Sequence, residues 1–273
     1  MNNLAVIKTQ PEDFESFVHI SYNQVRTFLQ CPQKYFYQYV RGMEWEFIPD
    51  YFPFGGAIHK AVEGFYRHFA ENGEKLSLDI FLETFRKAWK LSLSEKIRFK
   101  ETPEEMENKG TQLLEVFHNE TRPGRIIGVE IPFSVEMTIP ATGEILPCRL
   151  VGIFDLIETD QDGNPVVVEL KTAKKRFSED QLDLDFQPTL YGYALNQLGY
   201  STMKNETLIR FDLLLKTKKP DLERYFTIRN GKHYLQAVTT IKKILRAIEL
   251  EAFFPITGWH CSDCPFQKTC KQG

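Results

Sequence analysis

The stretch VVVELKT, residues 166–172, places a carboxylate and an ammonium group inside a run of β-branched residues. Three consecutive valines predict a strand that is buried on both faces. Side chains two residues apart on a strand point the same way, so Glu169 and Lys171 share one face. Either the two groups form an ion pair with each other, or a charged group binds between them.

A second carboxylate, Asp155, follows the apolar stretch LVGIF on the preceding predicted strand. The intervening turn, TDQDGN, contains Asp-Gly, which favours a hairpin that brings Asp155 toward Glu169. Two adjacent carboxylates repel each other unless a divalent cation compensates their charge, and Mg²⁺ or Mn²⁺ suits such oxygen ligands. Lys171 could then orient a water molecule or stabilise developing negative charge. This arrangement suits metal-assisted attack on a phosphodiester.

The cysteines suggest a second metal site. Their number, five, is odd, which argues against a disulfide framework. Three lie near the end of the chain in a C-x2-C-x5-C pattern: Cys261, Cys264 and Cys270. Three thiolates so close bind metal readily, and Cys31 is the candidate fourth ligand. The same thiolates could hold a structural Zn²⁺, in which case His260 could replace one of them. Cys148, in the apolar strand ILPCRLV, is predicted to be a small buried hydrophobe.

Hydrophobic periodicity predicts the elements that position these residues. A helix begins at Ser21, where Ser21 and Gln24 fit a capping box. Further helices are expected over residues 33–40, 55–69, 78–97, 103–120, 186–199 and 234–253. Strands are expected over residues 126–139, 145–158, 165–172 and 206–217. This order predicts a mixed α/β fold around one central sheet, with the early helices forming a lobe against it.

Charge and composition limit the partners. The 273 residues carry a net charge of −3, so a polyanion would have to be held by local basic patches or by metal ions. The patch expected to bind nucleic acid follows the catalytic strand and comprises Lys174, Lys175 and Arg176. A second group is as readily explained as a solvated face: Lys216, Lys218 and Lys219.

Targeting and motor motifs are missing from the sequence. There is no basic leader and no apolar run of membrane-spanning length, so we expect a soluble, cytoplasmic protein without a membrane partner. No G-x-x-x-x-G-K-[ST] motif is present, so any helicase would be a separate partner.

Taken in order, the motifs resemble those of the PD-(D/E)XK nuclease superfamily, in its RecB-like iron–sulfur branch. Gly152-Ile-Phe-Asp155 followed by Glu169-Leu-Lys171 is similar to the catalytic signature. The segment FGGAIH, which ends at His59, resembles the early Gly-x-x-x-His helix, and QPTLY, residues 187–191, resembles the Q-x-x-x-Y motif. One early and three late cysteines resemble the four ligands of a [4Fe-4S] cluster. The resemblance extends from Ser21 to Cys270.

This resemblance implies a restriction-endonuclease-like fold, a mixed central sheet flanked by helices. An N-terminal helical lobe would be stapled to the C-terminus by the cysteine-ligated cluster. Residues 1–20 would be an extension, and residues 21–273 a single nuclease domain. Within that domain, residues 21–125 would form the helical lobe, 126–255 the catalytic core and 256–273 the cluster segment.

The resemblance also implies the roles of individual residues. Metal ligands would be His59, Asp155, Glu169 and the carbonyl group of Leu170. The expected catalytic residues are Lys171, Gln187 and Tyr191. The cofactors would be Mg²⁺ or Mn²⁺ and a [4Fe-4S] cluster ligated by Cys31, Cys261, Cys264 and Cys270. A histidine near a helix start is often structural, and acidic residues near the site such as Glu63 and Glu130 are more readily explained as salt-bridged surface groups.

The implied activity is that of a DNA exonuclease acting on single-stranded ends, with 5′ to 3′ polarity. Related stand-alone exonucleases trim DNA for CRISPR spacer acquisition, beside an integrase complex, and others act in DNA repair or recombination. A different class stays open, namely a catalytically silent DNA-end-binding subunit of a larger repair complex. Retention of His59, Asp155, Glu169 and Lys171 favours the enzyme.

Overall fold

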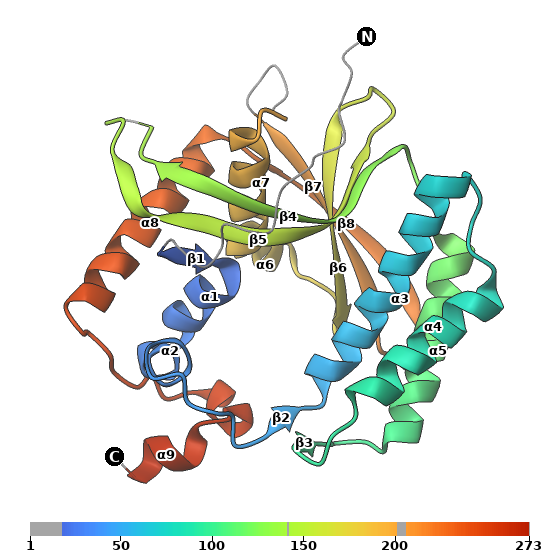
Figure 1. Ribbon diagram of the computed structural model, residues 1–273, viewed down its shortest axis with the longest axis horizontal. Helices are drawn as coiled ribbons and strands as arrows, with labels where there is room; N and C mark the ends of the chain where they lie inside the picture. The colour runs from blue at the N-terminus through green and yellow to red at the C-terminus, as the bar shows by residue number, and fades with distance from the viewer. Residues whose placement is uncertain (1–17, 141, 201–205, 273) are drawn as a thin grey trace.

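A single mixed sheet organises the chain in the computed structural model, which describes residues 18–140, 142–200 and 206–272 (Figure 1). The strand order is β1-β5-β6-β7-β8, and β4 pairs with the other edge of β5. Parallel pairing joins β1 to β5 and β6 to β7, and the other neighbours are antiparallel. The six strands are β1 (His19–Ser21), β4 (Ile126–Thr138), β5 (Ile145–Thr159), β6 (Pro165–Ala173), β7 (Thr207–Leu215) and β8 (Asp221–Arg229).

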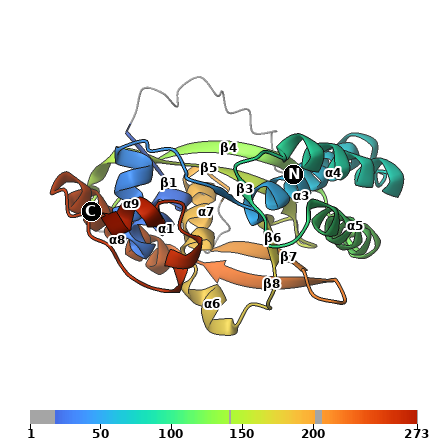
Figure 2. The same cartoon turned by 90° about the horizontal axis from the view of Figure 1, so that it is seen from below.

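Helices cover both faces of this sheet, as expected for a mixed α/β fold. The principal helices are α1 (Tyr22–Gln30), α3 (Tyr51–Asn72), α4 (Leu78–Ser92), α5 (Pro103–Glu120), α7 (Phe186–Gln197) and α8 (Gly231–Glu249). Side chains of α1, α7 and α8 pack on one face, and those of α3, α4 and α5 pack on the other. Figure 2 shows the two helical groups on either side of the strands, seen from below. The sheet therefore separates two hydrophobic cores.

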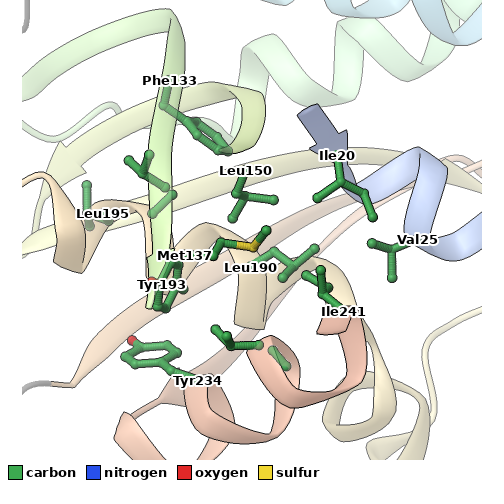
Figure 3. Close-up of a cluster of buried hydrophobic side chains, with 14 of the residues drawn as sticks. Ile20, Val25, Phe133, Met137, Leu150, Leu190, Tyr193, Leu195, Tyr234 and Ile241 are labelled. Atoms are coloured by element: carbon green, nitrogen blue, oxygen red, sulfur yellow. The ribbon is translucent and has the colours of Figure 1, made fainter. Parts of the chain in front are cut away.

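The first core joins the beginning of the chain to its later helices. Ile20 of β1 and Val25 of α1 are buried with Leu190 of α7 and Ile241 of α8. Figure 3 shows these side chains meeting, with Met137 beside Leu190. The capping box predicted at Ser21 is present, since the Ser21 hydroxyl accepts from Gln24 N and the Gln24 side chain accepts from Ser21 N. Helix α1 is thereby fixed directly after its strand.

The long strand β5 shares one of its edges between two partners. Its first half pairs with β1 up to Val151, opposite Ser21, and its second half pairs with β6 from Leu156, opposite Val168. Between these points, residues 152–155 have no ladder partner on that edge among the described strands. This interruption leaves backbone groups of β6 available to side chains, and Asp155 lies at its end.

Most predicted elements are observed, and the differences have local causes. The helix expected over residues 103–120 has those bounds. Helix α3 begins at Tyr51, before the glycine pair at which a start was expected. Pro53 lies in the first turn, where its missing N–H costs no hydrogen bond, so the proline and not the glycines marks the start. The helix expected over 78–97 ends at Ser92, and Ile97 belongs to a short strand.

Several elements were not predicted. Strand β8 alternates in the opposite sense to the usual pattern, because Phe226 and Ile228 are exposed whereas Thr227 and Arg229 are buried. Strand β1 is only three residues long, and a second sheet contains only β2 (Ile48–Pro49) and β3 (Ile97–Arg98). Such short segments carry no periodic signal.

The C-terminal segment returns to the first helices. Here α2 (Pro32–Tyr35), a π-helix (Phe36–Val40) and α9 (Gln267–Gln272) lie together (Figure 2). Gln33 N donates to the Phe254 carbonyl at 3.1 Å, and Glu46 N donates to the Pro265 carbonyl at 3.2 Å. Phe36 packs on Phe253 with ring centroids 4.9 Å apart. The aromatic residues of the π-helix region are therefore used largely in packing.

No helix of the described ranges is long and apolar enough to cross a membrane.

Candidate active site

Asp155 occupies the interruption in the β5–β6 ladder. Its Oδ2 atom accepts the backbone N–H of Leu170 at 2.9 Å, and its Oδ1 atom lies 3.5 Å from Nδ1 of His59. Gly152, three residues earlier, allows the ring of Phe133 to lie on the strand, since a Cβ there would meet that ring at 2.5 Å. The glycine thus provides the space that the Gly-x-x-Asp stretch needs, and the carboxylate bridges β5, β6 and α3.

Glu169 lies beside Asp155 and is only 3% exposed. One carboxylate oxygen, Oε1, is 2.5 Å from the ammonium group of Lys171, so the ion pair considered from the sequence is present. The other oxygen, Oε2, is buried without a hydrogen-bond partner among the described residues. Burial, and then the charge of Asp155, raises the pKa of Glu169 to about 7, although Lys171 acts in the opposite direction. A buried carboxylate with one unpartnered oxygen is costly unless a cation binds there.

Glu130 is the third carboxylate of the site. It lies on β4 between Val129 and Ile131, which pair with Leu156 and Phe154, so it stands opposite Asp155. Burial, and then the charge of Asp155, raises its pKa to about 7. Its backbone has a φ of 50°, in the left-handed region that is costly for a residue with a Cβ. The expectation that Glu130 is a salt-bridged surface residue is therefore wrong, since no described cation pairs with it. Glu63 does have that role, because it binds Lys60 at 2.7 Å and Arg67 at 2.9 Å.

His59 reaches the carboxylates from α3. The neighbouring residue Ile58 and, one turn away, Val62 are buried in the second core, which fixes the rotation of the helix. Burial opposes protonation of His59, but the hydrogen bond and the charge of Asp155 outweigh it and raise the pKa of the imidazole. Single ligand atoms of His59, Glu130 and Asp155 lie within 4.8 Å of one another. We call these three residues and Glu169 the carboxylate centre.

The carboxylate centre fits a divalent cation in its donor set. Two or three carboxylates and one imidazole are ligands that Mg²⁺ and Mn²⁺ accept. Burial, and then the charge of Asp155, raises the pKa values of Glu130 and Glu169, and a bound cation would favour their ionised forms. The buried Oε2 atom of Glu169, which has no partner among the described residues, is available as a further ligand atom.

Gln187 and Tyr191 lie on one face of α7, as their spacing predicts. The hydroxyl of Tyr191 is hydrogen-bonded to the Gln187 side chain, and burial followed by the charge of Glu169 holds its pKa well above the usual range. The ring of Tyr191 packs edge-on against Phe133 and Phe154, at 5.7 and 5.4 Å. The Oε1 atom of Gln187 is buried without a partner in the described part of the chain. Both side chains therefore adjoin the carboxylate centre on the α7 side of the sheet.

The predicted basic patch is not uniform. Lys174 and Lys175 are exposed at the end of β6, and Lys174 lies 3.7 Å from Glu101. Arg176 is bound to Glu223 and lies 3.6 Å from Asp221, so two carboxylates already pair with its positive charge. Of the three, Arg176 has the least charge available for a phosphate group.

The four cysteines of the expected cluster gather at the junction of the two chain ends, which we call the cysteine junction. Cys31 is buried, and its sulfur accepts the N–H of Ile256 at 3.5 Å. Burial raises the pKa of the thiols of Cys264 and Cys270, and nearby Cys31 and Cys261 raise it further. Within the described part of the chain, no three of these sulfurs lie within 4.8 Å of one another. Cys148 is buried in the first core, as predicted.

A family model of the PD-(D/E)XK nuclease superfamily matches residues 19–271. The chain belongs to this superfamily. The match spans the carboxylate centre, the α7 motif and the cysteine junction. No curated protein sequence matched the chain.

Solved structures were also compared with the chain. A protein of Eubacterium rectale named a "putative exonuclease" aligns with a TM-score of 0.52 at 12% identity, covering 98% of this chain and 94% of that one. The protein SSO0001 aligns at 14% identity with a TM-score of 0.36, over 84% and 87% of the two chains. Rai1 of Scheffersomyces stipitis aligns at 13% identity with a TM-score of 0.27, over 78% and 65%. Only the first supports a shared fold.

Proposed function

We propose that this chain is a metal-dependent DNA exonuclease that acts on single-stranded ends. The observation that carries the proposal is the carboxylate centre, in which Glu169 is buried beside Lys171 with one carboxylate oxygen unpartnered among the described residues. A structural ion pair needs no third carboxylate and no histidine. Membership of a nuclease superfamily supports the same conclusion.

The roles follow from the positions of the side chains. His59, Glu130, Asp155 and Glu169 would hold one or two Mg²⁺ or Mn²⁺ ions, with the Leu170 carbonyl as a further ligand. Such an ion, when bound, polarises a phosphoryl oxygen and lowers the pKa of water. Lys171 positions the attacking water, since its ammonium group already lies 2.5 Å from Glu169. Gln187 and Tyr191 orient the phosphate or the strand, from the other face of the site.

The cysteine junction is proposed to hold a [4Fe-4S] cluster. A single tetrahedral Zn²⁺ with Zn–S bonds of about 2.3 Å needs sulfurs roughly 3.8 Å apart. No three of the described sulfurs lie within 4.8 Å of one another, so the proposal takes the group whose ligands are more widely spaced, in line with the family resemblance. The packing of the C-terminal segment on α2 supports an architectural role, in which the cluster holds residues 256–273 against the first helices of the chain.

Substrate polarity and pathway rest on the family resemblance alone. We propose 5′ to 3′ degradation, in CRISPR spacer acquisition or in DNA repair and recombination, with an integrase complex or a separate helicase as partner. The rival is a DNA-end-binding subunit without catalysis. A binding subunit has no use for buried carboxylates with raised pKa values, so the structure favours the enzyme.

End-labelled oligonucleotides test the proposal. Single- and double-stranded substrates are incubated with anaerobically purified protein in Mn²⁺, Mg²⁺ or EDTA, alongside Glu169→Ala. Metal-dependent degradation that vanishes in the variant is expected, with the label released first from the 5′ end. Binding without cleavage by protein that retains its cysteine-bound metal would establish the end-binding subunit instead.

A further inference from the structure

A second pocket, separate from the carboxylate centre, opens at the ends of β6 and β7. It has a volume of about 190 Å³. Four lysines from different parts of the chain line it: Lys100, Lys109, Lys174 and Lys216. Two carboxylates, Asp50 and Glu101, also line it, which leaves two more positive than negative charges in the lining. We call it the lysine pocket.

The carboxylates of the lysine pocket are already engaged. Glu101 binds Lys109 and lies 3.7 Å from Lys174. The buried Asp50 accepts the backbone N–H of Lys100 at 2.9 Å, while the ammonium group of Lys100 lies 2.6 Å from Asp263. The acidic groups thus fix the positions of three lysines without fully neutralising the pocket.

Lys216 is the exceptional member of the set. It is half-buried, and no described carboxylate lies within ion-pair distance of its ammonium group. That group lies 5.0 Å from the centre of the Phe54 ring. Burial, and then the charge of Lys174, lowers the pKa of Lys216. Its backbone is held in place because Lys216 N donates to the Ala173 carbonyl at 2.7 Å. A rigidly placed, poorly compensated lysine is suited to an anionic ligand.

The lysine pocket adjoins the carboxylate centre through two elements. Phe54 and His59 are five residues apart on α3, a rise of about 7.5 Å. Lys171 and Lys174 are three residues apart at the end of β6, roughly 10 Å. A nucleic acid strand has one phosphate for about every 3.4 Å of helical rise, so a strand cleaved at the centre would carry another phosphate group within reach.

We propose that the lysine pocket binds a phosphate group of the substrate strand and so sets the position of the strand relative to the carboxylate centre. The proposal rests on the proposed function for the identity of the strand. The phosphate is either a terminal monoester or an internal diester. A terminal phosphate would make the pocket a sensor of the strand end, whereas an internal phosphate would make it a guide for the strand.

Binding without metal tests the pocket independently of cleavage. Fluorescent single-stranded oligonucleotides carrying a 5′-phosphate, a 3′-phosphate or neither are titrated in EDTA at several salt concentrations. Lys216→Gln is expected to weaken binding roughly tenfold and to reduce the slope of log K against log salt by about 0.7. Lys216→Arg should restore most of the affinity. The matched control is Lys232→Gln, at the exposed start of α8, which should change affinity less than about twofold.

The possible outcomes distinguish the proposal that the pocket binds phosphate from the proposal that the protein is a nuclease. If one terminal phosphate improves binding and Lys216→Gln removes that preference, the ligand is the strand end. If all three oligonucleotides lose affinity equally in Lys216→Gln alone, the ligand is an internal phosphate. If the Lys216→Gln and Lys232→Gln variants bind the oligonucleotides with equal affinity, or if the wild type does not bind them, the proposal that the lysine pocket binds phosphate is wrong. Lys216-dependent binding by a wild type that cleaves nothing in Mn²⁺ would overturn the nuclease proposal only.

Discussion

The carboxylate centre and the cysteine junction are both sites of converging ligands, yet they are built differently. The carboxylate centre lies on four elements, α3, β4, β5 and β6, which are fixed by the sheet and the second hydrophobic core. The cysteine junction joins two chain ends through a few backbone hydrogen bonds and aromatic contacts. The first site is preorganised at an electrostatic cost, and the second, on the proposal made above, depends on a bound metal cluster to hold the chain ends together. Losing a ligand should therefore affect chemistry at the first site and folding at the second.

The largest effect is expected at Lys171. Replacing it in Lys171→Gln should reduce the cleavage rate by about 10²–10³-fold, because a group that stabilises charge or positions water is removed. Mn²⁺ affinity should not fall, since the variant loses a competing cation. Lys60→Gln is the matched control, because Lys60 lies on the adjacent surface and pairs with Glu63. Unchanged cleavage in Lys171→Gln would mean that Lys171 is only a structural partner of Glu169.

Losing a ligand at the cysteine junction should lower the stability of the folded protein. Cys264→Ser is expected to remove the visible absorption of an iron–sulfur cluster and to lower the melting temperature by roughly 5 °C or more. Absorption spectra and thermal melts of anaerobically purified protein measure both. Cys148→Ala is the control, since Cys148 is buried in the first core and should leave the absorption intact. A colourless wild type that melts at the same temperature as Cys264→Ser would remove the proposed difference between the two sites.

The metal-free carboxylate centre should make stability fall as pH rises. The pKa of Glu169 is raised from 4.5 to about 7 in the folded protein, so the folded state binds more protons than the unfolded state between these values. The stabilising contribution of protonated Glu169 is complete below pH 4.5 and is lost as pH rises through about 7. Its size is on the order of 3 kcal/mol at about 1.4 kcal/mol per pKa unit.

Denaturant unfolding in EDTA across this pH range measures the effect. Glu169→Gln should show a flatter profile, and saturating Mn²⁺ should restore wild-type stability at the alkaline end. If the free energy of unfolding of the metal-free wild type does not change with pH, ionising Glu169 in the folded protein costs no stability, and the prediction is wrong.

Part of this organisation could be predicted from the sequence. Asp155 and Glu169 each follow an apolar run, and the Asp-Gly turn between their strands predicts a hairpin, so local sequence patterns were enough to bring the two residues together. Glu130 could not be assigned, because on β4 it is one of several alternating polar residues. Its role depends on the β4–β5 register and on its positive φ, which only the folded chain defines.

The lysine pocket could not be predicted from the sequence either. Lys100 and Lys216 are more than a hundred residues apart, and each alone is indistinguishable from a solvated lysine. Strand β8 was missed because its apolar side chains face outward at the edge of the sheet. In each case the missing information was a tertiary contact and not a local preference.

Calorimetric titration with Mn²⁺ tests the carboxylate centre most directly. Wild type, Glu130→Gln and Glu63→Gln are compared at pH 8, above the pKa of about 7 of Glu130 and Glu169. The wild type should bind Mn²⁺, and Glu130→Gln should bind about 10–100-fold more weakly because a ligand at the centre is lost. Glu63→Gln, which alters an ion-paired glutamate on α3, should match the wild type. Equal affinity in all three proteins, or no binding by the wild type, would contradict the assignment of these residues to a catalytic metal site.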